Sequence, residues 1–515
     1  MKRLSLFSLS FAWLVGGGPG ALSAAPAAHP NIIFIMTDQH RWDSLGANGN
    51  TIIRTPNFDR LAAGAANFTH AFVSSPVCVP SRVSFFTGRY SHSHRNRVNY
   101  TPLDRGEVLM QARLKAAGYA TATVGKLHLH PPTVEEAERT GFDFVDLHDA
   151  SGPLDRFSSY VKWLREKNPV RANSYRAVAK SIEKGGNPFR AAIADEFSET
   201  TWTGLRARHH LEHLTKGTKP FFLNVSFWKP HSPWEISVPW DRMYRDVTIP
   251  LPHAMSLEEI QRLPPPLQAL ILRGKPVYGM DREQLQWAWR SYYAAISQVD
   301  REVGLILDQL ERSGAAGNTI IAFSSDHGDQ MLEQGLMGKN CFFDSSVRVP
   351  FMIRLPGRVQ PKKHDELIET VDLLPTLFEL AGLPVPYLTQ GRSLVPLITG
   401  DGRGWEPRTV VFSENVIPEV ITHNKSDFAF EKGKGIKGTR HPDAKMVRTR
   451  QWKYNYYPDG FAELYNMERD PGERINLHGD PAYSAVEATM KDHLLKWLCT
   501  ADEADQIAPR WLQPE

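Results

Sequence analysis

The sequence predicts an α/β protein with a central mixed, mostly parallel sheet flanked by helices, and a smaller C-terminal subdomain of antiparallel sheet plus helix. Three observations lead to this prediction. Continuous β-branched and apolar runs, which mark strands buried on both faces, recur along the first 355 residues. Segments of helical periodicity separate these runs. After residue 396 the pattern changes to short runs broken by turn signals, which indicates an antiparallel meander.

The expected elements follow in chain order. Apolar runs predict buried strands at 31–37, 119–124, 221–226, 319–324 and 350–355. Periodic apolar positions predict helices at 57–68, 195–214, 284–310 and 371–381. Short runs predict the C-terminal meander at 409–412, 445–448, 452–457 and 462–465, with a closing amphipathic helix at 485–498. The polar segment 151–188 and the proline-rich segment 242–276 are expected to be insertions over the sheet edge.

Length and the first residues indicate the domain organisation. A chain of 515 residues fits one large domain plus a smaller one, which we expect at 28–396 and 397–515. A basic start, a short apolar run and then small residues are typical of a secretory signal peptide, here residues 1–25. The apolar run is too short to span a membrane comfortably. We therefore expect an exported protein, periplasmic or secreted, without a membrane anchor.

Composition narrows the class of protein further. The formal net charge is only +3, so nothing indicates a nucleic-acid partner. The three cysteines, Cys78, Cys341 and Cys499, form neither a metal-binding spacing nor a complete disulfide framework. Function must therefore be inferred from particular residues.

Polar side chains follow four of the predicted strands at the point where each strand ends. These are Asp38 and Gln39, Lys126 and His128, His231, and Asp326 and His327. Ligands bind at the carboxyl ends of strands in open α/β sheets, so these groups are expected to converge on one crevice. One polar strand end is ordinary loop chemistry, whereas four on one sheet indicate a site.

The stretch 75–88 places Cys78 between two prolines. Pro76 and Pro80 fix two backbone angles, so the cysteine is expected in a pre-shaped loop, with Ser81 as the N-cap of a following helix. The N–H groups of that helix and Arg82 would favour an oxyanion beside the cysteine. A buried structural cysteine next to a turn is the alternative, and this stretch alone does not decide between them.

The motif Cys-x-Pro-Ser-Arg, followed at this spacing by Thr87-Gly88-Arg89, resembles the signature of the type I sulfatases of the alkaline-phosphatase-like superfamily. The segment 463–477 also resembles that family, so the likeness covers nearly the whole mature chain. The resemblance implies the family's fold and conversion of Cys78 to formylglycine by a separate formylglycine-generating enzyme. The hydrate of that aldehyde would attack the sulfur of a sulfate ester.

The candidate metal ligands indicate a hard divalent cation. Asp38 and Asp326 offer carboxylates, Gln39 offers an amide oxygen and His327 an imidazole. The resemblance adds the matured Cys78 as a ligand and implies Ca²⁺, while imidazole ligation leaves Mn²⁺ or Mg²⁺ open. Gln39 stands where relatives usually carry a second acid, so metal affinity is expected to be weaker. A turn with an N-capping acid is the alternative for Asp326.

The resemblance also assigns roles to the remaining residues. Arg82 and Lys126 would hold the aldehyde hydrate, and His128 would take the proton from its second hydroxyl. His231 and Lys339 would bind the sulfate and protonate the leaving oxygen. Two further residues, His94 and Asn99, could face the leaving group.

Three functions follow as hypotheses. The first is an exported sulfatase that hydrolyses sulfate esters, with sulfated carbohydrates as the expected substrate class. The second is a phosphonate monoester hydrolase or phosphodiesterase of the same superfamily, whose members share the cysteine signature. The pair Lys126 and His128 favours the sulfatase, because those relatives commonly lack it. The third is a sulfated-glycan binding protein whose Cys78 stays unmodified.

Overall fold

The computed structural model describes the chain from residue 29 to residue 501, apart from several internal gaps. The gaps are 100, 150–157, 174–193, 235, 254–255, 264–266, 269–270, 272–280, 401, 417–442 and 459. The predicted signal peptide therefore lies outside the described residues, as does most of the predicted insertion at 151–188. In the described part of the chain, no helix combines the length and the apolar character needed to cross a bilayer.

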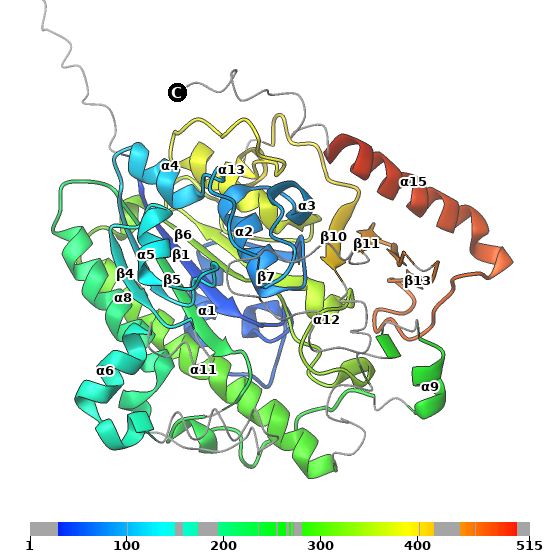
Figure 1. The fold of residues 1–515 in the computed structure, drawn as a ribbon, viewed down its shortest axis with the longest axis horizontal. Coiled ribbons are helices and arrows are strands. Elements are labelled where there is room, and N and C mark those ends of the chain that lie inside the picture. Colours follow the sequence, from blue (N-terminus) through cyan, green and yellow to red (C-terminus); the bar gives the residue numbers. More distant parts are fainter. Residues whose placement is uncertain are drawn as a thin grey trace, which may run out of the picture.

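A nine-stranded mixed sheet forms the centre of the molecule, with helices on both faces (Figure 1). Its strand order is β4-β3-β5-β1-β6-β7-β2-β8, and β9 pairs with β2. The strands are β1 (Asn31–Asp38), β2 (Ala66–Phe72), β3 (Ala120–Gly125), β4 (Phe144–Leu147), β5 (Phe221–Pro230), β6 (Thr319–Ser325), β7 (Arg348–Arg354), β8 (Lys362–His364) and β9 (Ile368–Glu369). The five strands from β4 to β6 are parallel, while β7 runs antiparallel to both neighbours. The predicted fold class is confirmed.

The helices cover both faces of this sheet, except that α15 packs on the C-terminal subdomain. They are α1 (Pro56–Ala63), α2 (Cys78–Thr87), α3 (Ser91–His94), α4 (Met110–Ala116), α5 (Val134–Arg139), α6 (Ser159–Lys167), α8 (Glu199–Thr215), α9 (Leu257–Gln261), α11 (Arg282–Arg312), α12 (Asp344–Val347), α13 (Leu373–Leu380), α14 (Val395–Ile398) and α15 (Ser484–Ala501). Short 3₁₀ turns lie at Gly46–Asn48, Asp195–Phe197, Trp240–Arg242, Ala316–Asn318, Glu333–Gly335, Thr370–Asp372 and Pro481–Tyr483.

Strand β1 explains why both faces of the sheet are covered. Its side chains alternate between two apolar cores, as the two-residue period of a strand requires. Ile33 and Ile35 pack in the core that includes residues of α8 and α11. Phe34 and Met36 pack in the opposite core, which includes residues of α2 and α13. A strand buried on both faces reads as a continuous apolar run, which is why the sequence revealed it.

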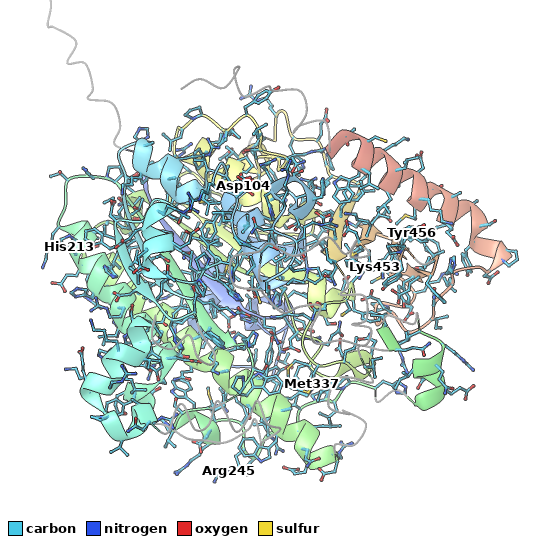
Figure 2. The ribbon with its side chains drawn as sticks, viewed as in Figure 1. Asp104, His213, Arg245, Met337, Lys453 and Tyr456 are labelled. Carbon is cyan, nitrogen blue, oxygen red and sulfur yellow. The ribbon has the colours of Figure 1, made fainter. Side chains whose placement is uncertain are left out.

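The C-terminal subdomain is a separate four-stranded antiparallel sheet covered by one helix. It contains β10 (Val411–Val416), β11 (Asp443–Arg448), β12 (Trp452–Tyr456) and β13 (Ala462–Asn466), paired in that order. Helix α15 packs on β11 and β12, and Lys453 and Tyr456 mark this region in Figure 2. The meander and closing helix expected from the sequence are both present. The domain boundary at 396 and 397 stays a prediction.

One predicted helix is partly wrong. The segment expected to be helical at 57–68 divides into α1, which ends at Ala63, and the strand β2, which begins at Ala66. Gly64 follows the helix, and the apolar residues after it belong to a buried strand. A short apolar run next to a helix fits either period, so the sequence alone did not separate the two elements.

Candidate active site

Four residues that could bind a metal ion lie together at the carboxyl end of the main sheet. They are Asp38 at the end of β1, Cys78 at the start of α2, and Asp326 and His327 after β6. One possible ligand atom from each lies within 4.8 Å of the others, and all four residues are buried. Because β1 and β6 are adjacent parallel strands, their carboxyl ends bring Asp38 and Asp326 close together.

Cys78 is the first residue of α2, so the prediction of a loop cysteine before a helix capped by Ser81 is wrong. A proline is tolerated in the first turn of a helix, and Pro80 therefore lies inside this one. Asn99 Oδ1 accepts a backbone N–H of the first turn at 3.1 Å and so supplies the cap. The Ser81 hydroxyl instead donates to the backbone carbonyl of Asp326, which fastens the helix to the loop after β6.

Asp38 has one carboxylate oxygen that accepts hydrogen bonds and one that accepts none from the described residues. Its Oδ2 accepts from Lys126 Nζ at 2.6 Å and from Arg82 at 3.0 Å. Its Oδ1 is buried and, among the described residues, has no hydrogen-bond partner. His327 Nε2 lies 3.9 Å and Lys339 Nζ 4.0 Å from this atom. A buried carboxylate oxygen without a donor is costly, so this atom fits a cation.

His327 is oriented as a metal-binding imidazole would be. Its Nδ1 lies 2.9 Å from the Gly328 carbonyl, which assigns the proton to Nδ1 and leaves the lone pair on Nε2. This Nε2 is 3.2 Å from Cys78 Sγ and 3.6 Å from Asp326 Oδ1. The lone pair therefore points into the group of candidate ligands.

Asp326 is held from two sides. Its Oδ2 accepts from Arg82 Nε at 2.8 Å. Its Oδ1 accepts the backbone N–H groups of Gln39 at 3.1 Å and His327 at 3.0 Å. Burial raises the pKa of Asp326, and the nearby Asp38 adds to this although Arg82 opposes it. A divalent cation between the two carboxylates would relieve their repulsion, so the residues present fit a metal.

Gln39 lies at the rim of this group in an unusual backbone conformation. Its φ of 71° is in the left-handed region, which is uncommon for a residue other than glycine and is often found at functional sites. Its Nε2 donates to Asp329, and its Oε1 accepts from Lys339 Nζ at 3.0 Å. The amide oxygen therefore faces the site, and its predicted role as a metal ligand stays a prediction.

Cys78 Sγ is surrounded by nitrogen groups. Lys339 Nζ donates to it at 2.8 Å, in addition to the contact with His327. Burial and Asp38 act to raise the pKa of Cys78. The Lys339 and Lys126 ammonium groups oppose both, and the pKa lies well below its usual value. A group with anionic character at position 78 is therefore favoured.

His231 follows β5 and faces the same group. Burial lowers its pKa to about 3, and Lys339 adds to the effect while Asp38 opposes it. The imidazole is therefore neutral at neutral pH. Its Nδ1 bonds the Ser232 carbonyl, so this nitrogen is used inside the loop.

Comparison with known proteins identifies the family. A family model described as Sulfatase matches residues 30–383. The chain belongs to the sulfatase family. It lies in the alkaline-phosphatase-like superfamily, and its enzyme class is sulfuric ester hydrolase.

Individual relatives cover almost the whole sulfatase chain. It is 29% identical to an arylsulfatase of Clostridium perfringens, over 91% of this chain and 94% of the relative. It is also 29% identical to an ulvan-active sulfatase of Formosa agariphila, over 93% of this chain and 83% of the relative. The solved phosphonate monoester hydrolase of Agrobacterium radiobacter is similar with a TM-score of 0.78 and 26% identity, covering 92% of this chain and 96% of that one.

In this sulfatase, Arg82 and Lys126 contact the carboxylates of the candidate metal group. The Arg82 guanidinium spans Asp38 and Asp326, and Lys126 Nζ pairs with Asp38. Both residues are buried, so they fix the two carboxylates in place. Their predicted contact with the matured side chain of Cys78 stays a prediction.

His128 is held by a residue that the sequence analysis did not single out. Its backbone N–H donates to both carboxylate oxygens of Asp149, at 2.8 and 2.9 Å, and its φ is 55°. Its Nδ1 is buried and has no hydrogen-bond partner within the described part of the chain. A signal for Asp149 existed, because it lies two residues after the short run that forms β4. Its proton-accepting role stays a prediction.

The structure does not bring His94 into the group. Its ring is buried, with Nε2 2.9 Å from Ser84 Oγ and Nδ1 3.1 Å from the backbone N of Asn96. Both nitrogens are therefore used inside its own segment. Asn99 lies closer to the site, but the contact it makes is the cap of α2.

Proposed function

We propose that this protein is an exported sulfatase that hydrolyses sulfate esters of carbohydrates, using formylglycine formed from Cys78 and one divalent metal ion. The position of Cys78 Sγ carries the proposal. It lies 2.8 Å from Lys339 Nζ and 3.2 Å from His327 Nε2, beside two buried carboxylates. A nucleophile, a cation site and a proton donor are the parts that sulfate ester cleavage needs.

Asp38, Asp326 and His327 would hold the metal ion together with Gln39 and the matured residue 78. Oxygen ligands favour Ca²⁺, with Mn²⁺ or Mg²⁺ as alternatives because one ligand is an imidazole. When bound, the ion would neutralise charge on the sulfuryl oxygens.

The other side chains would handle protons and the sulfate group. The hydrated aldehyde at position 78 would attack the sulfur with one of its two hydroxyl groups. Lys339 would hold the sulfuryl oxygens and supply the proton that the departing ester oxygen needs. His231 would share this role in its protonated form, because its neutral ring uses the Nδ1 proton for the Ser232 carbonyl. His128 would take the proton of the second hydroxyl as sulfate leaves and the aldehyde forms again.

Two further points support the substrate class and location. The ulvan-active sulfatase of Formosa agariphila, a similar protein, is by its name active on ulvan. The first residues are typical of a signal peptide, so the protein would act outside the cytoplasm after a formylglycine-generating enzyme has converted Cys78.

A second candidate is a phosphonate monoester hydrolase or phosphodiesterase. The TM-score of 0.78 with the phosphonate monoester hydrolase of Agrobacterium radiobacter favours it. The pair Lys126 and His128 favours the sulfatase.

A side-by-side assay separates the candidates. Purified protein, with the aldehyde at residue 78 verified by mass spectrometry, would be given an aryl sulfate, an aryl phosphonate monoester, a phosphodiester and a panel of sulfated sugars. We expect sulfate release to dominate and Cys78→Ala to be inactive. Faster turnover of the phosphorus esters would replace the proposed function by the second candidate. Binding of sulfated sugars without any turnover would indicate a binding protein.

A further inference from the structure

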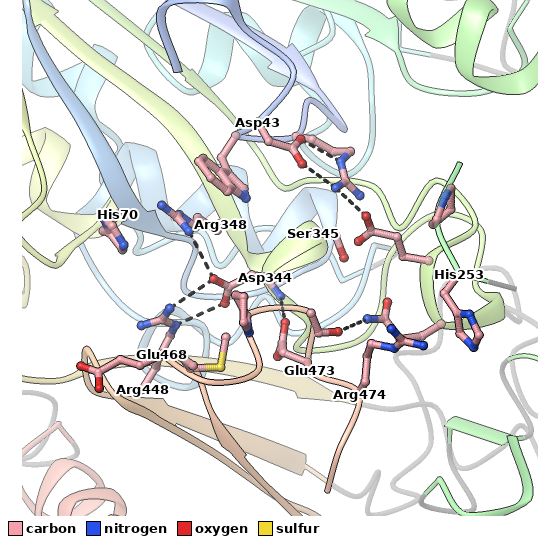
Figure 3. A pocket seen from close by; sticks show the side chains of 18 of the residues that line it. Asp43, His70, His253, Asp344, Ser345, Arg348, Arg448, Glu468, Glu473 and Arg474 are labelled. Carbon is pink, nitrogen blue, oxygen red and sulfur yellow. Dashed lines mark hydrogen bonds and ion pairs between the residues drawn. The ribbon is translucent and has the colours of Figure 1, made fainter. Parts of the chain in front are cut away.

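A cavity of about 670 Å³, separate from the candidate active site, lies where the main sheet meets the C-terminal subdomain (Figure 3). Its wall comprises residues from the loop after β1, the start of β7 and the segment after β13. None of the four candidate metal ligands lines it. The segment from Asp329 to Lys339 lies between the two sites, because Lys339 contacts Cys78 while Glu333 lines the cavity.

Arg348 is a rigid cation in the wall of this cavity. Its Nε donates to the Thr69 carbonyl at 2.6 Å, and its guanidinium lies 3.5 Å from the centre of the Trp42 ring. The residue is only 8% exposed. Its terminal amino groups, by contrast, have one partner among the described residues, Asp344 at 3.5 Å. A buried, pre-oriented guanidinium with spare donors matches the geometry of a carboxylate or sulfate.

Cations and carboxylates alternate in the wall around Arg348. Asp344 is shared by Arg348, by Arg448 at 3.3 Å and by Lys453 at 2.5 Å. The nearby Glu473 shares the same Lys453 at 2.6 Å. Around Asp344 three cations therefore face two carboxylates, whereas the whole wall carries five arginines and six acidic residues. An anion would be held by the spare donors of Arg348 and not by a net positive charge.

His70 lies in the same wall. Burial lowers the pKa of His70 to about 3, and Arg348 and Arg448 add to the effect. Figure 3 shows His70 and the two arginines around Asp344. The group has room beside it for a ligand, since cavities of several hundred Å³ accommodate small molecules.

We propose that this cavity binds an oxyanion, the sulfate or carboxylate group of an acidic saccharide, on Arg348 with Arg448 and His70 beside it. The oxyanion site rests on the geometry alone, whereas the saccharide that carries it rests on the proposed function. Glu333, Gln334 and His253, also in the wall, would meet saccharide hydroxyl groups. Free sulfate has the same chemistry and is the second possible source.

The test measures binding in the full chain carrying Cys78→Ala and Lys339→Ala, so that turnover at the candidate active site is abolished and sulfate binding there is weakened. Calorimetric titrations would use a sulfated disaccharide in one arm and sodium sulfate in the other, at constant ionic strength. Two variants would be compared with this background. Arg348→Lys keeps the charge and loses the planar fork. His70→Glu places a carboxylate beside the arginines, where it would occupy the oxyanion site from within.

We expect each variant to raise the Kd at least tenfold, and His70→Glu to keep the thermal midpoint of its background. Tighter binding in the disaccharide arm would identify a saccharide site, and equal molar affinity in both arms would identify a free-anion site. No binding in either arm, or binding that neither variant weakens, would overturn the proposal. The proposed function fails separately, if the intact Cys78 protein releases no sulfate in the assay above.

Discussion

At the scale of single residues, Asp38 is the side chain whose surroundings best suit the binding of a cation. One of its oxygens is saturated by two cations, and the other is buried with no donor in the described part of the chain. Apolar interiors rarely hold such an atom. The sequence indicated this site because an acidic residue ended a buried strand, but the asymmetry of the two oxygens depends on Lys126 and Arg82, which are distant in sequence.

Adding metal should therefore stabilise the protein through Asp38. Ca²⁺ at 100 times its Kd should raise the free energy of unfolding by about 2.7 kcal/mol relative to chelated protein. Asp38→Asn should lose most of this gain, whereas Asp365→Asn, an exposed acid of the surface pair with Arg450, should keep it. Thermal unfolding with and without Ca²⁺ measures both. An equal gain in the two variants would argue against Asp38 as a ligand.

His94 makes a pH-dependent prediction. Burial holds its folded pKa at about 3 although Glu414 opposes this, and the unfolded value is near 6.5. Below pH 6.5 the unfolded chain binds a proton at His94, whereas the folded protein does not. The free energy of unfolding is therefore unaffected by His94 above pH 6.5 and falls as the pH drops below that value. From pH 7.5 to 5.5, wild type should lose about 1.4 kcal/mol more than His94→Gln. Urea unfolding at both pH values tests this, and equal losses would contradict it.

At the scale of elements, the candidate groups lie where strands end, and several residues at these strand ends have a left-handed backbone conformation. Gly125 ends β3 directly before Lys126 with a φ of 90°, and Gln39 and His128 are also left-handed. The sequence predicted which strands end in polar residues. It did not predict these conformations. At Gly125 the neighbouring strand requires the glycine, because a Cβ there would lie 2.0 Å from the Ser226 carbonyl oxygen.

Gly125→Ala should consequently damage the site. Gly118 provides a matched control, since its φ of 91° is almost the same but nothing lies within 4 Å of an added Cβ. Gly118→Ala should cost about 1 to 2 kcal/mol from the backbone strain alone. Gly125→Ala should cost roughly 1 to 3 kcal/mol more because of the clash, and should reduce kcat by displacing Lys126. Unfolding curves and aryl sulfate kinetics provide the comparison; similar losses in both variants would refute it.

Helix α2 depends on a cap from outside the helix. Asn99→Ala removes the acceptor for the first-turn N–H and should cost about 1 kcal/mol of stability. Asn99→Asp keeps an acceptor oxygen and should be close to wild type. Chemical denaturation of the three proteins measures this. A loss of activity in Asn99→Asp with unchanged stability would instead point to a substrate contact.

At the scale of the whole molecule, the C-terminal sheet is fastened to the segment that follows Lys339. Asn415 of β10 donates to the Asn340 carbonyl at 3.0 Å, and Lys453 of β12 donates to the Phe342 carbonyl at 2.9 Å. The sequence predicted the meander from its short runs and turns. These ties could not be predicted, because each joins residues more than 70 positions apart and no local pattern encodes them.

Lys453 should be the most costly of these ties to remove. It is fully buried and pairs with both Asp344 and Glu473, so Lys453→Met would leave two buried carboxylates short of a cation. Breaking a buried pair in this way typically costs about 3 to 5 kcal/mol. Lys491→Met, which removes a half-exposed pair with Glu487, should change stability by at most about 0.5 kcal/mol. Urea unfolding of both variants gives the free energies.

The carboxylate left behind in Lys453→Met can be tested as well. Burial raises the pKa of Glu473 to about 7 even with Lys453 present. Adding Glu473→Gln to Lys453→Met should therefore recover part of the lost stability, because an amide carries no charge that needs a partner. If the double variant is no more stable than the single one, the loss comes from packing and not from the unpaired carboxylate. Sulfatase activity should recover alongside stability, since the segment that Lys453 fastens begins directly after Lys339.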